Sequence, residues 1–569
     1  RLLKYLSKYK FFVILAFVCV LLSTGANLLG SYMLRPIING LVDGGDLGKL
    51  AFSLLVMAAI YLTGIIASYA QQRIMIWVSQ SVLKNIRDEL FQKLQKLPVR
   101  YYDTHSNGEL MSRFMNDVDA IGEMMNNSVI QLFSGAITLI GTLVLMIRMN
   151  LWLTLITIVF VPLVAKVGGM IAGKSRRFYR EQQAALGAVN GYVEESVSGQ
   201  KVVKVFCHEE VCEEEFGLLN RDLREKQIRA QFFGGLMGPV LGNLSQATYA
   251  ITACVGGILC VVQGFDLGGF SVFVNYSRQF SRPINEVSMQ VNTIFSALAG
   301  AERVFAVMDE QPEPEDLPDA VGADQMKGYV QLKNVYFGYN PDTVILKDIS
   351  LYAKPGQKIA FVGSTGAGKT TVTNLLSRFY DIQQGEITID GVNLYDYKRK
   401  DLRSHIAMVL QDTHLFTGTV MENIRYGRLD ATDEEIIEAA KSVSAHNFIV
   451  RLSDGYQTMI EGDGANLSQG QRQLLNIARA AVSKAPILVL DEATSSVDTR
   501  TEKHIEQGMD ALMASRTTFV IAHRLSTVRN ADAIMVLEHG VIIERGTHEE
   551  LLAQKGRYYE LYTGKAELD

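Results

Sequence analysis

Long apolar runs occupy the first half of the chain, whereas the second half alternates between apolar and polar residues as globular domains do. Six runs of roughly 20 to 28 residues begin near Phe11, Leu50, Asn127, Leu151, Leu236 and Leu267. A bilayer core requires about 20 apolar residues per helix, because every backbone N–H and C=O must be bonded within the helix. The pattern therefore predicts six membrane-spanning helices.

Two of the connecting segments continue a helical pattern instead of forming loops. Residues 80–97 and 174–235 are rich in Glu, Gln, Lys, Arg and Leu and contain few Gly or Pro. Such composition favours helix, so we expect the spanning helices to extend well beyond the bilayer. Residues 102–108 and 206–214 then lie at the tips of two helical hairpins, where they could contact the second half of the chain.

The last apolar run carries polar residues where apolar ones are expected. They are Asn275, Arg278, Gln279, Arg282 and Glu286. The spacing of four between Arg278, Arg282 and Glu286 places them on one helical face. A charge at the bilayer centre costs ~2.5 to 3.5 kcal/mol, which favours a face toward a polar cavity. The alternative is that Arg282 and Glu286 simply pair near the cytoplasmic end.

In the second half, an apolar strand pattern leads into a glycine-rich turn and then a helical pattern, in the segment FVGSTGAGKT. Gly363, Gly366 and Gly368 allow backbone N–H groups to converge on phosphate oxygens at the start of a helix. Lys369 is expected to reach the terminal phosphates and Thr370 to hold Mg²⁺. This context predicts a nucleoside triphosphate site.

A second buried-type strand, ILVLDE, ends in two carboxylates. We expect Asp491 to support the metal and Glu492 to polarise or deprotonate the attacking water, a role that typically supplies 10²- to 10⁴-fold in rate. Acidic residues often end strands without any such role. The glycine-rich loop upstream makes the catalytic interpretation the stronger one.

Two further features exceed what a single phosphate loop needs. The segment LSQGQRQ, residues 467–473, places a serine and a glycine at the start of another helical pattern, a second phosphate-seeking N-terminus. One fold cannot easily direct two such helices at one phosphate, so the pattern predicts a dimer with shared sites. His523 follows the strand TTFVIA and could reach a γ-phosphate, although a lone histidine after a strand is more often structural.

Composition supports a division into two parts. The chain has 569 residues, a length that exceeds what one hydrophobic core normally holds. Hydrophobic residues make up 48% of it, and the mean hydropathy is +0.12. Residues 311–328 contain Pro312, Pro314, Pro318 and many acidic residues, which are typical of a boundary. We expect a transmembrane domain over 1–310, a linker over 311–328 and an ATPase domain over 329–569.

Charge and cysteine content exclude several functions and set an orientation. The net charge is −5 without a long basic tract, so we expect no nucleic acid partner. The five cysteines form no CxxC pair, which speaks against a disulfide framework or a zinc site. Lys and Arg concentrate in the two long polar connections, which predicts that these, both termini and the second half face the cytoplasm.

Taken together, the ordered motifs GSTGAGKT, VLQD, LSQGQ, ILVLDEATSSVD and AHR resemble those of ATP-binding-cassette half-transporters of the exporter type. The resemblance covers essentially the whole chain. It implies the type IV exporter fold, with six extended all-α transmembrane helices followed by an α/β P-loop ATPase domain that carries a helical subdomain. In that subdomain we expect Thr432 and Glu435 to form a capping box before the segment IIEAA.

The resemblance also implies a set of site residues. The nucleotide-binding residues would be Tyr339, Gly363, Ser364, Thr365, Gly366, Ala367, Gly368, Lys369, Thr370, Thr371, Ser468, Gly470, Gln471 and Asp498. The catalytic residues would be Glu492, His523 and Gln411, and the Mg²⁺ ligands would be Thr370, Gln411 and Asp491. Tyr339 would stack on adenine, while Ser468 and Gly470 would contact the partner's nucleotide.

The first polar tip resembles the family's first coupling loop, with Asp103, Gly108, Arg113 and Asp117 at matching positions in YYDTHSNGELMSRFMNDV. Two departures matter. Gln469 replaces the first glycine of the usual LSGGQ, and Glu461 and Gly462 stand where Gly and then Glu are usual. They resemble one subunit of a heterodimeric exporter with one strong and one degenerate ATP site; a homodimer that tolerates Gln469 is the alternative.

The function that the resemblance implies is ATP-driven export, or leaflet translocation, of amphipathic small molecules or lipids across a bacterial cytoplasmic membrane. Its cofactors would be ATP and Mg²⁺. Within the family, drug efflux, lipid flipping and peptide export are alternatives, and so is an ATP-gated channel. A soluble cassette ATPase is disfavoured by the six apolar runs, and an importer by the fusion of both parts in one chain.

Overall fold

The computed structural model describes residues 1–569 except 45, 341, 412, 492–498, 523–527 and 564–569. The chain divides into two compact units. The helical unit comprises Arg1–Lys96 and Ser106–Gln311, and the α/β unit comprises Leu97–His105 and Pro312–Asp569. The short segment Leu97–His105 therefore leaves the helical unit to join the other one.

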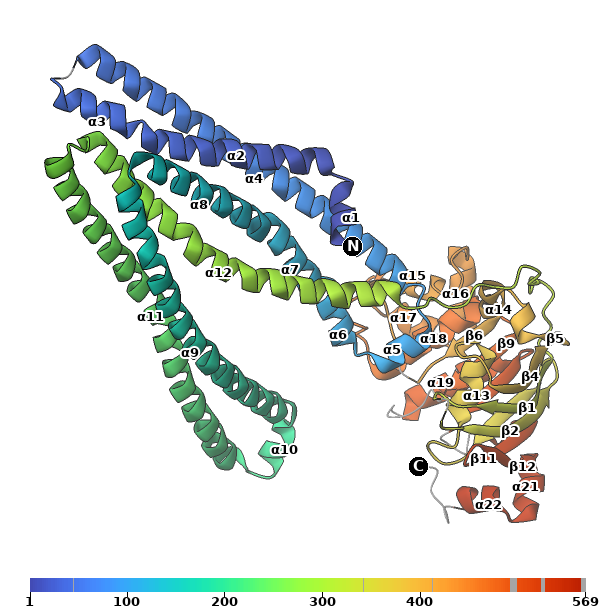
Figure 1. Cartoon of the computed structure of the whole chain (residues 1–569). Coiled ribbons are helices and arrows are strands. Elements are labelled where there is room, and N and C mark those ends of the chain that lie inside the picture. Colours follow the sequence, from blue (N-terminus) through green and yellow to red (C-terminus); the bar gives the residue numbers. More distant parts are fainter. Residues whose placement is uncertain (45, 341, 412, 492–498, 523–527, 564–569) are drawn as a thin grey trace. The chain divides into compact units, whose positions relative to one another are not determined.

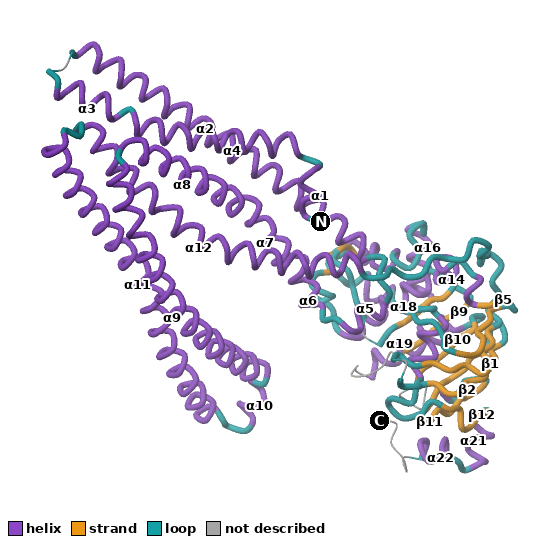
Figure 2. The backbone as a smooth tube through the Cα atoms, in the orientation of Figure 1, coloured by secondary structure: helices purple, strands orange, loops and turns teal. Residues whose placement is uncertain are grey.

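The helical unit consists of long helices joined by short turns, as Figures 1 and 2 show. Its helices are α1 (Leu2–Ser7), α2 (Lys10–Tyr32), α3 (Leu34–Val42), α4 (Leu47–Leu94), α6 (Asn107–Ser112), α7 (Val118–Glu123), α8 (Val129–Met149), α9 (Leu151–Ser198), α10 (Gln200–Val205), α11 (Glu209–Gln263) and α12 (Leu267–Asp309). Two π-helical turns, Arg113–Asp117 and Met124–Ser128, join α6, α7 and α8.

Each of the six apolar runs lies in one long helix, namely α2, α4, α8, α9, α11 and α12. In the described residues, four continuous helical stretches are long and apolar enough to cross a membrane, namely Lys10–Val42, Leu47–Leu94, Asn107–Met149 and Glu209–Val262. The helices α9 and α12 include positions whose side chains lie outside the described set.

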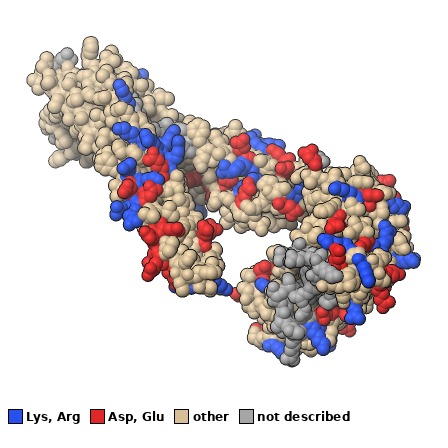
Figure 3. Space-filling model, turned by 90° about the horizontal axis from the view of Figure 1, so that it is seen from below, with Lys and Arg blue, Asp and Glu red and all other residues tan. Residues whose placement is uncertain are grey.

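The predicted polar extensions are confirmed. Helix α4 continues to Leu94, α9 continues to Ser198, and α11 begins at Glu209. The helices are interrupted at residues 105–106 and 206–208, within the two segments where hairpin tips are expected. On the face that Figure 3 shows, charged side chains are few toward the α3 end of the helical unit and many toward the α10 end.

The helices of this unit pack as neighbouring pairs, with α2 along α4, α9 along α11 and α8 along α12. A buried cluster that includes Leu28, Met146, Phe273 and Tyr276 joins α2, α8 and α12. The Tyr276 hydroxyl donates to the backbone oxygen of Leu28 at 2.8 Å, which satisfies the one polar atom that this aromatic side chain buries.

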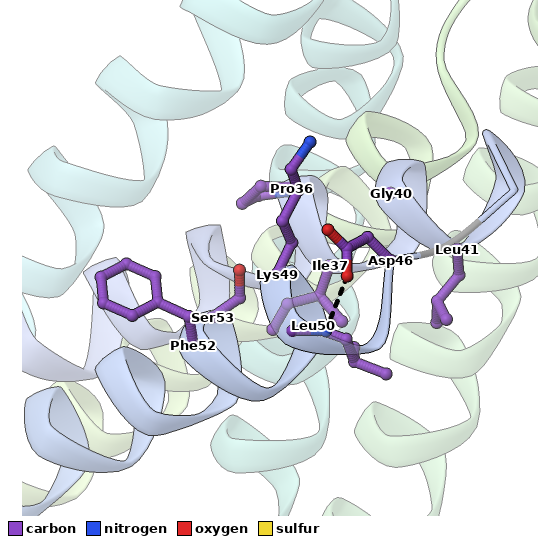
Figure 4. A pocket seen from close by; sticks show the side chains of 10 residues that line it. Pro36, Ile37, Gly40, Leu41, Asp46, Lys49, Leu50, Phe52 and Ser53 are labelled. Carbon is purple, nitrogen blue, oxygen red and sulfur yellow. Dashed lines mark hydrogen bonds between the residues drawn. The ribbon is translucent and has the colours of Figure 1, made fainter.

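The α3 end of the unit is fixed by caps and one ion pair. Asp266 caps α12 by accepting from the Gly269 N–H at 2.7 Å, and it receives two bonds from Arg35 at 2.8 and 2.9 Å. Between α3 and the start of α4 lies a cavity of about 550 Å³. Figure 4 shows Lys49 and Leu50 on its α4 side, with the Asp46 cap beside them.

The described residues of the α/β unit form three sheets. Its strands are β1 (Val330–Phe337), β2 (Leu346–Ala353), β3 (Lys358–Val362), β4 (Gln384–Ile389), β5 (Val392–Asn393), β6 (Ile406–Val409), β7 (Gly418–Thr419), β8 (Met459–Ile460), β9 (Ile487–Asp491), β10 (Thr517–Ile521), β11 (Ala533–Glu538) and β12 (Val541–Gly546). Its helices are α5 (Val99–Thr104), α13 (Lys369–Leu376), α14 (Arg399–Ser404), α15 (Val420–Arg425), α16 (Asp433–Ser442), α17 (His446–Ile449), α18 (Gln469–Val482), α19 (Thr499–Met513), α21 (His548–Gln554) and α22 (Arg557–Tyr562).

The largest sheet has the strand order β12-β11-β3-β10-β9-β6. All neighbours in it are parallel except β11 and β12. Strands β3 and β10 are fully or almost fully buried along most of their length, as expected for parallel strands covered on both faces. The second sheet, β2-β1-β4-β5, is antiparallel.

Helices α15 to α18 share one hydrophobic core with strands β6 and β9 and form the helical subdomain. The predicted capping box at its start is confirmed, since the Thr432 hydroxyl accepts from the Glu435 N–H and the Glu435 carboxylate accepts from the Thr432 N–H. Arg428 and Lys484 also bind Glu435 and, with this backbone bond, lower the pKa of Glu435 to about 2.

The proline-rich segment after α12 lies against the α/β unit through polar contacts. The Glu313 carboxylate accepts two bonds from Arg403 at 2.8 and 3.0 Å. The Asp390 carboxylate accepts from the backbone N–H groups of Lys327 and Tyr329 at 2.7 and 2.8 Å. Two separate pairings thus hold this segment along the unit to which it belongs.

Candidate nucleotide site

The five parallel strands described in the large sheet, β11, β3, β10, β9 and β6, end at one edge. In the register, Ile521 of β10 lies opposite both Phe361 of β3 and Asp491 of β9, and Val409 of β6 lies opposite Leu490. Residues that follow these strands therefore gather at the carboxyl edge, where open α/β sheets bind their ligands. The glycine-rich loop follows β3, Asp491 ends β9 and Gln411 follows β6.

Backbone geometry explains the glycines of the loop. Gly363, Gly366 and Gly368 have φ values of +153°, +81° and +102°, which side-chain-bearing residues rarely adopt. A Cβ on Gly363 would lie 2.2 Å from the Leu537 backbone oxygen, and one on Gly368 would lie 2.5 Å from Leu346 Cδ2. The loop thus presents bare backbone at the N-terminus of α13, a form suited to a polyphosphate.

Lys369 is the first residue of α13, and its side chain is buried. Its Nζ donates to the backbone oxygens of Gly363 at 2.6 Å and Ser364 at 3.1 Å, so the ammonium group arches over the loop. Thr370, Thr365 and Gly366 are exposed beside it. The donor set therefore fits a nucleoside triphosphate, with the Thr370 hydroxyl open to solvent for a metal.

The remaining expected loop residues lie in the same turn or on the same helix. Ser364 and Ala367 belong to the turn, where Ala367 is buried. Thr371 is buried on α13, and its hydroxyl lies 3.3 Å from the Tyr339 hydroxyl. This side chain supports the tyrosine that is expected to contact the base.

Asp491, the last residue of β9, is half-buried at the carboxyl edge. Glu492 and Asp498, which follow it, and His523, which follows β10, lie outside the described residues. Their strands are described, and β10 lies between β3 and β9. The expected roles of these three residues stay predictions.

Gln411 lines a cavity of about 250 Å³ together with Gln469, Arg472 and Gln473 from α18 and residues near Asp463. Gln411 is thus next to α18, the helix that begins at Gln469, where the family usually has glycine. In the same region His414 Nδ1 lies 3.5 Å from Asp463 Oδ2. The sequence did not indicate that Gln411 and Gln469 would share one cavity.

Tyr339 follows β1 and is half-buried. Its ring meets Phe337 and Tyr380 edge to face, with centroid distances of 5.1 and 4.9 Å. Asn374 donates to its hydroxyl at 3.5 Å. These contacts fix the plane of the ring, as stacking on an adenine base requires.

Ser468 is the N-cap of α18 and forms a capping box. Its hydroxyl accepts from the Gln471 N–H at 3.3 Å, and the Gln471 side chain accepts from the Ser468 N–H at 2.9 Å. Ser468 is exposed and Gly470 is buried. The serine hydroxyl and the helix N-terminus lie at the surface, where a partner's phosphate could bind.

A contact that the sequence did not reveal joins helix α5 to the base side of the site. The Tyr380 hydroxyl donates a short hydrogen bond to the Asp103 carboxylate of α5. Burial and this bond raise the pKa of Tyr380 well above its usual value. Pro98 and Arg100 also line a cavity of about 290 Å³ that Tyr339 and Tyr380 border. Tyr380 therefore contacts both the predicted coupling loop and the predicted adenine-stacking residue.

We expect Tyr380→Phe to loosen α5 while the ring contact with Tyr339 persists. The variant loses one bond to a carboxylate near the surface, worth about 1 kcal/mol, so amide exchange in residues 99–104 should become about five-fold faster. Hydrogen exchange followed by mass spectrometry measures this. Tyr395→Phe is the matched control, since the Tyr395 hydroxyl bonds the Ile382 N–H; equal protection of α5 in both variants would contradict the assignment.

The other predicted coupling-loop residues make contacts within the helical unit. The Asp117 carboxylate is buried and accepts two bonds from Arg303 of α12. Arg113 pairs with Glu109, and Gly108 lies in α6. Asp103 thus belongs to the α/β unit, whereas Gly108, Arg113 and Asp117 belong to the helical unit.

The polar face of α12 is partly satisfied by neighbouring helices. Gln279 donates to the Ser31 hydroxyl at 2.8 Å, whereas Arg278 is exposed and lies 4.8 Å from the Tyr249 ring centroid and 3.4 Å from Gln246 Oε1. The side chains of Arg282 and Glu286 lie outside the described residues. Within the described residues Arg278 has these two neutral partners and no carboxylate, so its charge is not compensated.

Both halves of the chain match known families. Residues 13–284 match the ABC transporter transmembrane region, and residues 346–495 match the ABC transporter family. The second match includes the glycine-rich loop, Gln411, Ser468 and Asp491.

Relatives match over nearly the whole length. An uncharacterized ABC transporter ATP-binding protein of Bacillus subtilis, YfiC, is 43% identical over 100% of this chain and 94% of its own. A fatty acid ABC transporter ATP-binding/permease protein of Mycobacterium tuberculosis is 41% identical over 91% and 82%, and an ATP-dependent lipid A-core flippase of Syntrophus aciditrophicus is 35% identical over 96% and 91%.

Among solved structures, a bacterial Atm1-family ABC exporter with ATP bound superposes with a TM-score of 0.77. It is 29% identical, and the match covers 98% of each chain. The helical unit, the nucleotide motifs at the sheet edge and the relatives all indicate the same family. The chain belongs to the ATP-binding-cassette transporter family, as a half-transporter with the type IV exporter fold.

Proposed function

We propose that this chain is one subunit of a dimeric pump that uses ATP to move amphipathic small molecules or lipids across a cytoplasmic membrane. The observation that carries the proposal is the convergence of the glycine-rich loop, Asp491 and Gln411 at one edge of a sheet, in a chain that also holds the helical unit. Relatives named for a fatty acid and for lipid A-core support the substrate class.

The residues of the site have separate tasks. Lys369 and the loop amides bind the phosphates, and Tyr339 stacks on the base. Thr370, Gln411 and Asp491 would hold Mg²⁺, which would supply neutralisation of the charge that develops between the terminal phosphates. Glu492 orients and deprotonates the water, and His523 contacts the γ-phosphate. Closure of two such units on ATP switches the helices from inward-open to outward-open, and hydrolysis resets them.

Exporters of this family work as dimers, and the second polar tip supports this arrangement for the chain. Phe206 at that tip is 67% exposed, and Val202 and Val205, in α10 just before it, are 61% and 76% exposed. Apolar residues so exposed mark an interaction surface. The part of the first tip up to His105 belongs to the α/β unit of its own chain, so the second tip is suited to the ATPase unit of a partner.

We further propose that the partner is a different half-transporter. Gln469 in the signature, with Glu461 and Gly462 upstream, supports a pair in which this chain supplies the catalytic Glu492 and an altered signature helix. The basic polar connections support a cytoplasmic location of the ATPase unit and both termini. Arg278 favours a substrate with an anionic group.

A tagged chain recovered from its native membrane tests both proposals. We expect it to carry a second half-transporter in equal amount and, in proteoliposomes with Mg²⁺, to move a fluorescent fatty acid or phospholipid only while ATP is hydrolysed. Full substrate-stimulated ATPase activity of the chain alone would contradict the heterodimer. Flux that continues with a non-hydrolysable ATP analogue would instead indicate a channel.

A further inference from the structure

A cavity of about 430 Å³ lies between the start of α2 and the middle of α4, which pack side by side (Figure 1). Its lining residues are Phe12, Arg73, Ile74, Ile76, Trp77 and Gln80. Arg73, Trp77 and Gln80 follow one another at helical spacing and therefore share a face of α4. The cavity combines apolar walls with one cation and one amide.

The charged residues of the two helices indicate the level of this cavity within the bilayer. No charged residue lies between Lys49 and Arg73 on α4, or between Lys10 and Arg35 along α2 and the start of α3. At 1.5 Å per residue, Lys49 and Arg73 are about 36 Å apart along the axis. A hydrocarbon core measures about 30 Å, and 40 to 45 Å with the headgroup regions. Arg73 and Lys10 therefore lie at headgroup depth on one side of the bilayer.

Aromatic rings mark the same level. Tyr9 meets the Trp77 ring edge to face with centroids 5.6 Å apart, and Phe12 lies 4.9 Å from Trp77. Trp77 is 50% exposed and Phe12 is 39% exposed, so the rings are not covered by other parts of the chain. Tyrosine and tryptophan gather at the membrane interface because they have an apolar body and a polar edge.

Positive charge around the cavity lacks compensation. Arg73 is exposed and, within the described part of the chain, makes no ion pair and no hydrogen bond. Lys4, Lys8 and Lys10 just before and at the start of α2 are also exposed, and the described residues contain no ion pair for them. A guanidinium group at headgroup depth is suited to bind a phosphate through two bonds.

We propose that this cavity binds one anionic phospholipid of the cytoplasmic leaflet. The Arg73 guanidinium contacts the phosphate, and the Gln80 amide, which lies farther from the bilayer centre on α4, contacts the polar headgroup. The acyl chains run from this level past Phe12 toward the Lys49 end of α4. Basic pockets between spanning helices on the cytoplasmic side recognise anionic headgroups in this way. The choice of leaflet rests on the orientation proposed above, whereas the headgroup selectivity does not.

The chain itself supplies a reporter, since it contains two tryptophans and one of them, Trp77, lines the cavity. Trp152→Phe leaves Trp77 as the one tryptophan of this chain, and the same dimer with Trp77→Phe and Trp152→Phe gives the background to subtract. The full dimer in nanodiscs of phosphatidylcholine and phosphatidylglycerol, with bromine near the glycerol end of the acyl chains of one lipid at a time, then shows which lipid quenches Trp77. We expect brominated phosphatidylglycerol to occupy the site about five-fold more readily per cation involved, and added salt to reduce this preference.

Arg73→Gln should bring the two lipids close to equal quenching. Lys49→Gln is the matched control, because it removes a cation from the other end of the same helix, beyond contact with Trp77, and should keep the preference. Equal quenching by both lipids in the parent, or a preference that survives Arg73→Gln, would overturn the proposal. Absence of quenching by either lipid would overturn it too, since a protein surface would then cover the face. The measurement needs no ATP, so its failure is separate from that of the pump.

Discussion

Lys369→Ala is expected to weaken ATP binding by about 10- to 100-fold, since a hydrogen bond to a charged group contributes ~1.5 to 3 kcal/mol. The Lys369 ammonium group bonds the Gly363 and Ser364 backbone oxygens at 2.6 and 3.1 Å, so the substitution also frees the loop that it spans. Binding of a fluorescent ATP analogue to the purified transporter measures the loss.

Lys358→Ala provides a control at the other end of β3. Lys358 pairs with Asp510 at 3.9 Å and lies outside the loop, so its removal should leave ATP affinity within about two-fold, as for most surface substitutions. A Lys369→Ala protein that binds ATP as tightly as the parent would show that phosphate recognition depends on the backbone alone.

Glu492→Gln is expected to lower ATP turnover by about 10²- to 10⁴-fold while ATP still binds. Glutamine keeps the shape of the side chain and removes its ability to accept a proton. Glu492 directly follows Asp491, which ends β9 at the carboxyl edge shared with the glycine-rich loop. Steady-state phosphate release, measured together with nucleotide binding, separates the two effects.

The control for this variant is Glu461→Gln, which changes a carboxylate in the segment before the signature helix. If Glu461→Gln hydrolyses ATP at the parental rate and Glu492→Gln does not, Glu492 is the general base. Hydrolysis at the parental rate in Glu492→Gln would move the role to another residue, and His523→Ala would then be the next variant to examine.

Local patterns predicted the elements that depend on neighbouring residues. The strand before the glycine-rich loop, the Thr432 capping box and the helical extensions all follow from spacing, composition and caps within a few turns, and the structure confirms them. The positive φ values at Gly363, Gly366 and Gly368 are likewise encoded locally, because only glycine adopts them easily.

Features that join distant segments could not be predicted. No local pattern places β10 between β3 and β9, and none pairs Tyr380 with Asp103 across 277 positions of sequence. Proline does not interrupt the predicted helices, since α9, α11 and α12 continue through Pro162, Pro239 and Pro283. In membrane helices neighbouring groups satisfy the backbone that proline leaves unbonded.

The candidate site shows the same division. Lys369, Thr370 and Asp491 were predicted because each motif carries its own chemistry, whereas the cavity shared by Gln411 and Gln469 depends on how α18 packs beside β6. On α12, helical spacing placed Arg278 on a polar face, but only the neighbouring helices show that Gln279 already has a partner in Ser31.

The excursion of Leu97–His105 into the α/β unit has a mechanical consequence. If the segment after α12 were the one connection between the units, the α/β unit could rotate about it without moving the helices. A second attachment, at the turn between α4 and α6, removes that freedom. A movement of the ATPase unit is then transmitted to the helical unit at two places, the α4–α6 turn and the end of α12.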